Sequence, residues 1–180
     1  MRVCAYCTAS ARRAVRAATG VMPISSPPVL AATFDPRRLA GHDLLYFRLH
    51  GKPGAKAWYN DAGAAALTED QVLSVDLGGA VAVVANCYGD QGPMARALYT
   101  AGASAVIAGL GSNYAGARRV VGTDLLVRWV ILGLRMGMDV ERALGLARMR
   151  LRMSSWRASD RDAAQFAVLG RRDVDEGEVV

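Results

Sequence analysis

Two residues with reactive side chains each stand at the end of an apolar run in this sequence. His50, followed by Gly51, ends the run of residues 43–49, and Cys87 ends the run of residues 80–86. A thiolate is a nucleophile and an imidazole exchanges protons near neutral pH, so the two side chains could act together in acyl transfer. The backbone N–H groups of Gly51 and Cys87 could then stabilise the oxyanion that forms on the attacked carbonyl.

Each of these residues also has a simpler structural interpretation. A cysteine in a buried strand is usually a small apolar side chain, and a lone histidine usually has a structural role. The combination favours chemistry, because both residues follow apolar runs and both have a glycine close behind them, Gly51 and Gly89. We therefore expect His50 and Cys87 to form a dyad.

The two apolar runs must be strands if they are to position this dyad. Residues 43–49 (DLLYFRL) are dense in large apolar side chains, and residues 80–86 (AVAVVAN) form the continuous small-apolar run of a central strand buried on both faces. The carboxyl ends of parallel strands meet at one edge of a sheet, where ligands bind in open α/β folds. The sequence therefore predicts that His50 and Cys87 lie at the same edge.

The rest of the chain alternates apolar runs with helical patterns, which is typical of an α/β domain. A Thr68–Gln71 capping box predicts one helix start, and Asp139 predicts another. Further strands are expected at residues 2–7, 29–33 and 104–108, a one-turn helix from Asp35-Pro36, longer helices at 11–19, 92–102 and 123–136, and a polar loop over 54–66. We assign residues 1–153 to the domain and residues 154–180 to a C-terminal extension that is partly frayed at its acidic end.

The segment around the dyad resembles the caspase-like cysteine peptidases, and within them the bacterial CHAT and gingipain-like branches. The resemblance rests on LLYFRL ending at His50-Gly51, on AVAVVAN ending at Cys87, and on the following AGASAVIAG, and it covers residues 43–151. It implies a caspase-like three-layer α/β domain in which helices flank a mostly parallel central sheet. The chain is short for a complete peptidase of this type, so a homodimer or a partner protein is expected.

The resemblance also implies an activity and a set of site residues. The protein would be a cysteine endopeptidase acting on peptide or protein substrates, with Cys87 as nucleophile, His50 for the proton transfers, and the N–H groups of Gly51 and Cys87 as the oxyanion hole. Loops after the strands build the substrate pocket in this family, which makes Gly111, Ser112 and Asn113 candidates. Several relatives carry an acidic residue two positions before the cysteine, whereas this chain has Ala85, which disfavours an Arg/Lys preference.

Another function class stays open beside the peptidase. The same fold could serve as a catalytically inactive scaffold or regulatory module, with its cleft empty or blocked. Slow labelling of all three cysteines would favour that alternative, and fast labelling of Cys87 would favour the enzyme.

Composition limits the remaining possibilities. The 180 residues are 52% hydrophobic and 21% charged, which suits one globular domain, and the longest uncharged stretch, residues 98–117, contains four glycines and is a poor membrane span. The net charge of +6 would suit polyanions, but no aromatic residues interleave the arginines of the last amphipathic helix, so nucleic acid is a disfavoured partner. Three cysteines without an export signal favour reduced thiols and a cytoplasmic protein.

Two weaker motifs lead to no cofactor. Cys4 and Cys7 match C-x-x-C, but they fall inside the first expected strand and no second Cys/His pair completes a metal site. Gly109 and Gly111 resemble the start of a dinucleotide-binding loop, but the third glycine, Gly116, comes two residues too late. We expect neither a metal nor an organic cofactor.

Overall fold

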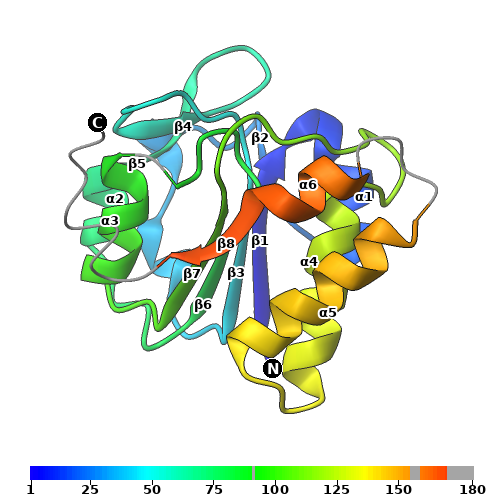
Figure 1. Ribbon diagram of the computed structural model, residues 1–180. Coiled ribbons are helices and arrows are strands. Elements are labelled where there is room, and N and C mark those ends of the chain that lie inside the picture. Colours follow the sequence, from blue (N-terminus) through cyan, green and yellow to red (C-terminus); the bar gives the residue numbers. More distant parts are fainter. Residues whose placement is uncertain (91, 155–158, 170–180) are drawn as a thin grey trace.

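A six-stranded, mostly parallel sheet forms the centre of the protein. The computed structural model describes residues 1–90, 92–154 and 159–169. The strand order is β2-β1-β3-β6-β7-β8, and only β8 runs antiparallel to its neighbour (Figure 1). The strands of this sheet are β1 (Val3–Thr8), β2 (Ile24–Ser26), β3 (Leu44–Arg48), β6 (Val81–Val84), β7 (Ala105–Gly109) and β8 (Phe166–Leu169).

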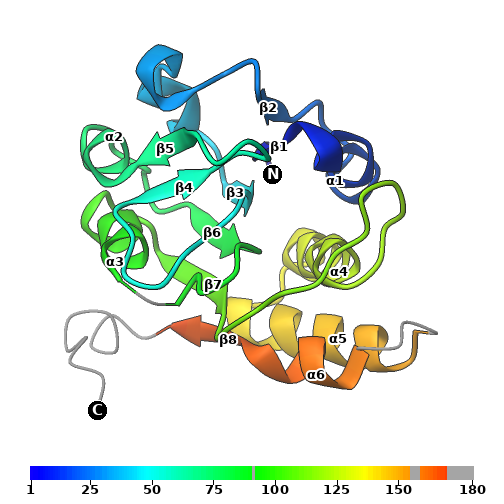
Figure 2. The ribbon, with the colours of Figure 1, turned by 90° about the horizontal axis from the view of Figure 1, so that it is seen from above.

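Helices cover both faces of this sheet and give the fold three layers. One face is covered by α1 (Arg12–Thr19), α4 (Thr123–Arg135), α5 (Val140–Arg152) and α6 (Ser159–Gln165), and the other by α2 (Glu69–Leu73) and α3 (Pro93–Thr100). Figure 2 shows the two helical layers on opposite sides of the strands. The α/β class and the layer arrangement expected from the sequence are confirmed.

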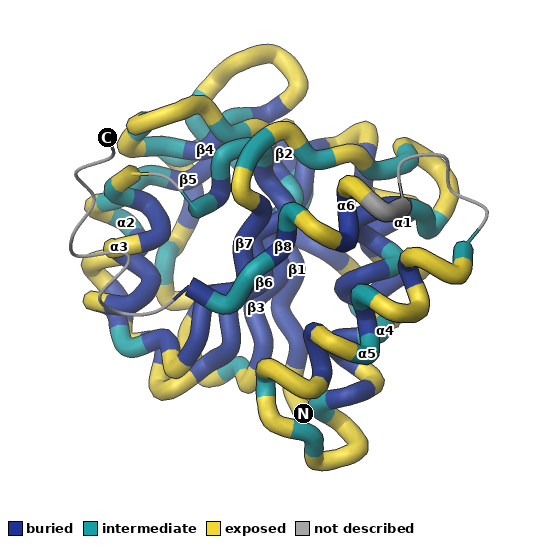
Figure 3. The backbone as a smooth tube through the Cα atoms, in the orientation of Figure 1, coloured by how far each residue is buried: buried dark blue, intermediate teal, exposed yellow. Residues whose placement is uncertain are grey.

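The alternation of side chains along β1 explains why two helical layers are needed. Cys4 and Tyr6 belong to the core cluster on the α2–α3 face, whereas Val3, Ala5 and Cys7 belong to the cluster on the α1–α4 face. Because successive side chains of a strand point to opposite faces, a strand that is apolar throughout must be covered on both. β1, β6 and β7 are buried throughout, whereas the edge strands β2 and β8 are buried only in part, as the teal stretch of β8 shows in Figure 3.

Local sequence signals fix several helix ends. The Thr68 side chain accepts a hydrogen bond from the Gln71 N–H, and the Gln71 side chain binds the Thr68 N–H, so the predicted capping box begins α2. Asp139 accepts from the Arg142 N–H and begins α5. Asp35 begins the one-turn 3-10 helix Pro36–Leu39. These three predictions are confirmed.

Two segments differ from the prediction. Residues 29–33 were expected to form a strand, but the strand is the earlier β2, and Ala31–Thr33 is a 3-10 helix. The expected polar loop over residues 54–66 instead contains β4 (Ala57–Tyr59) and the start of β5 (Ala65–Thr68), an antiparallel pair. Trp58 and Leu67 pair in this hairpin and both are buried, so it packs on the core rather than lying in solvent.

Part of the chain beyond the expected domain boundary at residue 153 belongs to the central sheet. The chain beyond it forms α6 and then β8, and β8 pairs with β7 from Val106↔Leu169 to Gly109↔Phe166. Phe166 is fully buried against the α4–α5 layer. The segment was hard to predict because its strand is only four residues long and depends on β7 for its hydrogen bonds. The acidic end that was expected to fray, residues 173–178, lies outside the described residues.

None of the helices in the described part of the chain is long and apolar enough to cross a lipid bilayer.

A buried polar network ties β3 to the start of α4. Asp124 is fully buried; one carboxylate oxygen accepts from Arg48 Nη1 at 2.7 Å and the other from the Tyr46 hydroxyl at 2.8 Å. The second guanidinium nitrogen of Arg48 donates to the Gly116 carbonyl at 2.8 Å. Burial raises the pKa of Asp124 to about 6, although Arg48 and Tyr46 act in the opposite direction. Both terminal nitrogens of the Arg48 guanidinium are therefore hydrogen-bonded to groups of the protein itself.

Removing the charge of Asp124 should destabilise the fold. Asp124→Asn leaves the Arg48 guanidinium buried without a counter-ion, so we expect a loss of about 3–5 kcal/mol in the free energy of unfolding, measured by urea denaturation. Lys56→Gln, which removes an exposed ion pair with Glu69 at 3.6 Å, is the control and should leave the midpoint almost unchanged. Equal midpoints for the two variants would contradict the role given to the network.

Candidate active site

The register of β3 and β6 brings His50 and Cys87 to the same level of the sheet. The two strands pair in parallel up to Phe47↔Val84, and the Ala85 N–H donates to the Phe47 carbonyl at 2.8 Å. His50 and Cys87 each lie three residues beyond that last pair. Both side chains line one pocket of about 250 Å³ at the carboxyl edge of the sheet.

A close backbone contact joins the two strand ends. A Cβ atom added to Gly51 would lie 2.0 Å from the Cys87 carbonyl oxygen, so no other residue type fits there without moving the backbone. On the next strand, the Asn86 side-chain oxygen accepts from the Leu49 N–H at 2.6 Å. The glycine after the histidine thus allows the dyad strands to approach each other.

His50 is held by the β4–β5 hairpin. Its N–H and carbonyl both bond to Tyr59 at 2.9 Å, and its Nε2 lies 3.2 Å from Asp61 Oδ1 in the turn of the same hairpin. With Nε2 directed at Asp61, Nδ1 is the ring nitrogen left for a reacting group; it has no hydrogen-bond partner among the described residues. The imidazole is 59% exposed and therefore accessible from solvent.

Asp61 is itself fixed from a third segment. The Ser10 N–H donates to Asp61 Oδ2 at 3.1 Å, and the Ser10 hydroxyl donates to Oδ1 at 2.9 Å. Partial burial raises the pKa of Asp61, but the hydrogen bonds from Ser10 and His50 outweigh it and leave the pKa below its ordinary value. Asp61 is a carboxylate at neutral pH and can orient the imidazole.

The Cys87 sulfur lies against the loop that follows β7. The Asn113 N–H donates to Cys87 Sγ at 3.4 Å, and the thiol lies 3.8 Å from the Asn113 carbonyl oxygen. The Asn113 side chain in turn donates to the Asn86 carbonyl at 2.7 Å. Tyr88, the residue that follows Cys87, has a positive φ of 54°. Such a φ is rare for a bulky side chain and marks a sharp turn directly after the thiol.

The backbone donors expected to form an oxyanion hole are available. Neither the Gly51 N–H nor the Cys87 N–H has a hydrogen-bond partner among the described residues. Cys87 lines the pocket that it shares with His50, whereas Gly51 is not among the residues that line it. Gly51 packs against the Cys87 carbonyl, so the two N–H groups lie on neighbouring stretches of backbone.

The predicted substrate-binding residues divide into two groups. Asn113 lines the pocket. Gly111 and Ser112 are not among its lining residues; the Gly111 carbonyl accepts from the Tyr88 N–H at 2.8 Å, and the Ser112 hydroxyl lies 3.5 Å from the Tyr88 hydroxyl. These two residues therefore position the loop beside the thiol.

Sequence reasoning missed Asp61, Ser10 and Arg48. Asp61 had a signal, because Asn60-Asp61-Ala62-Gly63 is a turn sequence: the Asn60 side chain accepts from two N–H groups of the turn, and Gly63 has a φ of 79°. Flanked by two short apolar runs, this turn could have indicated the hairpin. Ser10 and Arg48 lacked any such signal, since the fold alone brings them to the pocket.

The other two cysteines and the C-x-x-C motif are structural. Cys4 and Cys7 are buried on opposite faces of β1, so their thiols cannot meet at one ion. Desolvation by burial raises the pKa of Cys4 to about 11 and that of Cys7 to about 12. In the described part of the chain, no three His, Cys, Asp or Glu side chains gather in a group that could hold a metal.

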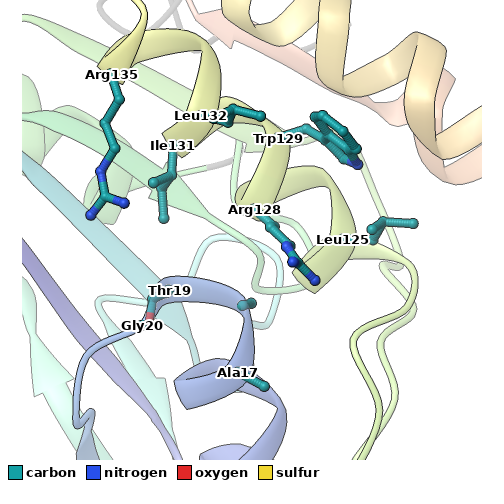
Figure 4. Close-up of a pocket in the computed structure, with 10 residues that line it drawn as sticks. Ala17, Thr19, Gly20, Leu125, Arg128, Trp129, Ile131, Leu132 and Arg135 are labelled. Carbon is teal, nitrogen blue, oxygen red and sulfur yellow. The ribbon is translucent and has the colours of Figure 1, made fainter.

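A larger pocket lies away from the thiol. It has a volume of about 490 Å³ and lies between the end of α1 and one side of α4 (Figure 4). Arg128 and Arg135 line it from α4, and Ala17, Thr19 and Gly20 line it from the end of α1. None of its lining residues is a cysteine, histidine, aspartate or glutamate, so it is not the candidate active site despite its larger volume.

Comparisons with known proteins support the fold. No protein-family model matches the chain, and no curated protein matches it in sequence. Among solved structures, it is similar to the Arg-specific cysteine proteinase gingipain R, with a TM-score of 0.60 and 15% sequence identity. The similarity covers 92% of this chain and 45% of that one, so this chain spans less than half of the gingipain chain. The expected caspase-like fold is confirmed.

The geometry predicts that Cys87 reacts first among the three thiols. Cys87 is half-buried beside His50, whereas Cys4 and Cys7 are buried with raised pKa values, which leaves at least about a hundredfold less thiolate than an ordinary cysteine would have. Iodoacetamide labelling followed by mass spectrometry should modify Cys87 at least about tenfold faster than either of the others, and His50→Ala should slow only that reaction. Equal rates at all three positions would contradict this assignment.

Proposed function

We propose that this protein is a cysteine endopeptidase of the caspase-like superfamily, in its CHAT and gingipain-like part, and hydrolyses peptide bonds in protein substrates. The observation that carries the proposal is the pairing of β3 with β6, which aligns His50 with Cys87 at one pocket while Asp61 holds the far side of the imidazole. Cys87 would be the nucleophile, His50 the proton-transfer group, and Asp61 the carboxylate that orients the imidazole.

The proposed reaction begins at the thiol. Cys87 transfers its proton to the His50 imidazole while Sγ attacks the peptide carbonyl carbon, and the N–H groups of Gly51 and Cys87 stabilise the resulting oxyanion. The C–N bond then breaks, His50 gives the proton to the leaving amine, and a thioester remains on Cys87. Water, deprotonated by His50, attacks the thioester, and the acid product leaves as the thiol is restored.

The lining of the pocket supports a proposal for the substrate preference. Ala85 is among the lining residues, so no carboxylate stands two positions before the nucleophile, and the positive charge of Arg48 is already neutralised by Asp124. A pocket without net charge suits a small uncharged side chain before the scissile bond. Asn113 borders this subsite, with Gly111 and Ser112 as the residues that hold its loop.

A second candidate is an inactive scaffold, favoured by one observation. The Cys87 sulfur is already in contact with both the N–H and the carbonyl of Asn113, and substrate would have to displace these contacts. A thiol is only a weak hydrogen-bond donor and acceptor, so these contacts are easily displaced, which favours the enzyme.

The length of the chain and its cysteines suggest two further features. Since the chain spans 45% of the gingipain chain, we include a homodimer or a partner protein as part of the active assembly. Three free thiols suit a reducing, cytoplasmic setting.

Hydrolysis of a mixed fluorogenic peptide library tests the function. The wild type should cleave some members of the library, and Cys87→Ala should abolish cleavage because it removes the nucleophile. Cys4→Ala is the matched control and should retain activity, since Cys4 is buried near the start of β1 and does not line the pocket. No cleavage by the wild type, combined with slow labelling of Cys87, would replace the peptidase with the scaffold.

Asp61 should act as a positioning residue. Asp61→Asn removes the negative charge behind the imidazole, so we expect kcat to fall by about 10- to 100-fold with KM almost unchanged. Asp61→Glu should restore part of the rate, and Asp70→Asn, which removes an exposed carboxylate on α2, should have no effect. A rise in KM at constant kcat would show that Asp61 binds substrate instead.

A further inference from the structure

A second, strongly basic depression lies beside the reactive pocket. This depression has a volume of about 470 Å³, and Ser10 and Ala117 line both it and the pocket of Cys87. Four arginines line it: Arg12, Arg13 and Arg16 of α1, and Arg118 from the loop before α4. We call these four residues the arginine patch.

The charges of the arginine patch are not used by the fold. All four side chains are exposed, none takes part in an ion pair among the described residues, and no Asp or Glu lines the depression. The Asp61 carboxylate, which binds the lining residue Ser10, is also paired with His50. By contrast, Arg48 of the neighbouring pocket is buried against Asp124.

The simpler explanation for the exposed arginines is an ordinary solvated helix face. That explanation covers the three arginines of α1 only in part. Ordinary wet faces mix charges of both signs, because like charges that share a concavity repel one another. Here Arg118, from a distant part of the sequence, adds a fourth positive charge to the three on α1. The gathering of four like charges next to a reactive thiol therefore suits a negatively charged ligand.

We propose that the arginine patch binds acidic residues of the polypeptide substrate beside the segment that enters the Cys87 pocket. The inference rests on the proposed peptidase function and adds a substrate class to it. From Arg12 to Arg16 the helix rises about 6 Å, which matches about two residues of extended chain. A cluster of two or three acidic residues close to the scissile bond is thus the expected recognition element.

The choice of a peptide over a nucleic acid follows from the surroundings of the patch. The depression shares Ser10 and Ala117 with a pocket that is lined by a thiol and an imidazole, the groups proposed to cleave a peptide. Its own lining has no aromatic side chain on which a base could stack. Its charge and its position beside the reactive pocket both fit an acidic peptide.

Paired peptides test the proposal. Peptides with one cleavable core carry three Glu or three Gln residues, placed either before or after the core. The wild type should cleave one of the Glu peptides with a kcat/KM about tenfold above its Gln partner, mainly through KM, because each exposed ion pair contributes modestly. The difference should shrink as salt is raised. Equal kcat/KM for Glu and Gln peptides at both positions would overturn the proposal.

Two matched variants locate the effect. Arg13→Gln/Arg16→Gln/Arg118→Gln should remove the preference for Glu while leaving cleavage of the Gln peptides unchanged. Arg128→Gln/Arg135→Gln/Arg152→Gln changes the net charge equally but lies on α4 and α5, so it should keep the preference. Loss of the preference in both variants would show an effect of net charge and overturn the assignment to the patch.

A binding measurement separates this inference from the peptidase proposal. Fluorescence anisotropy of a labelled Glu peptide is measured with Cys87→Ala, with and without the three patch substitutions, and requires no cleavage. Binding that is weakened about tenfold by the patch substitutions supports the proposal even if no peptide is hydrolysed; unchanged binding contradicts it. A single-stranded oligonucleotide is the competitor, and tighter binding of the oligonucleotide at equal salt would assign the patch to nucleic acid instead.

Discussion

The parallel pairing of β3 with β6 is the constraint on which the site depends. Side chains of a strand alternate between faces, so a shift of one residue would send either His50 or Cys87 to the wrong side of the sheet. The register is fixed on both faces by buried apolar residues, and at the carboxyl end by the contact between Gly51 and the Cys87 carbonyl. The buried centre of the sheet therefore positions His50 and Cys87.

The remaining parts of the site come from segments that the sheet brings together. The hairpin β4–β5 pairs with the backbone of His50 and delivers Asp61, while the turn after β1 supplies Ser10, which holds Asp61. The loop after β7 places Asn113 against the thiol. Each group is secured by at least one hydrogen bond from a different segment, so the imidazole and the thiol are oriented before a substrate arrives.

Arginine has two different uses in this chain. Arg48 is buried, and its bonds to Asp124 and Gly116 link the sheet to the start of α4, where it stabilises the structure and leaves the reactive pocket without net charge. The arginines of the patch face solvent and keep their charges free of ion pairs within the described residues. The net charge of +6 is therefore not spread evenly over the site. The pocket of Cys87 has no net charge, whereas the neighbouring depression is lined by four arginines.

The sequence by itself determined the α/β class, most strands and helices, and the placement of His50 and Cys87 after strands that end at the same edge of the sheet. These features follow from local patterns, such as the apolar runs before each residue, the Thr68 capping box and Asp139 at a helix start. Only the tertiary structure decided that these two strands are neighbours, that Asp61, Ser10 and Arg118 lie around the two pockets, and that β8 joins the sheet. Their positions depend on contacts between segments far apart in the chain, and no local pattern encodes such contacts.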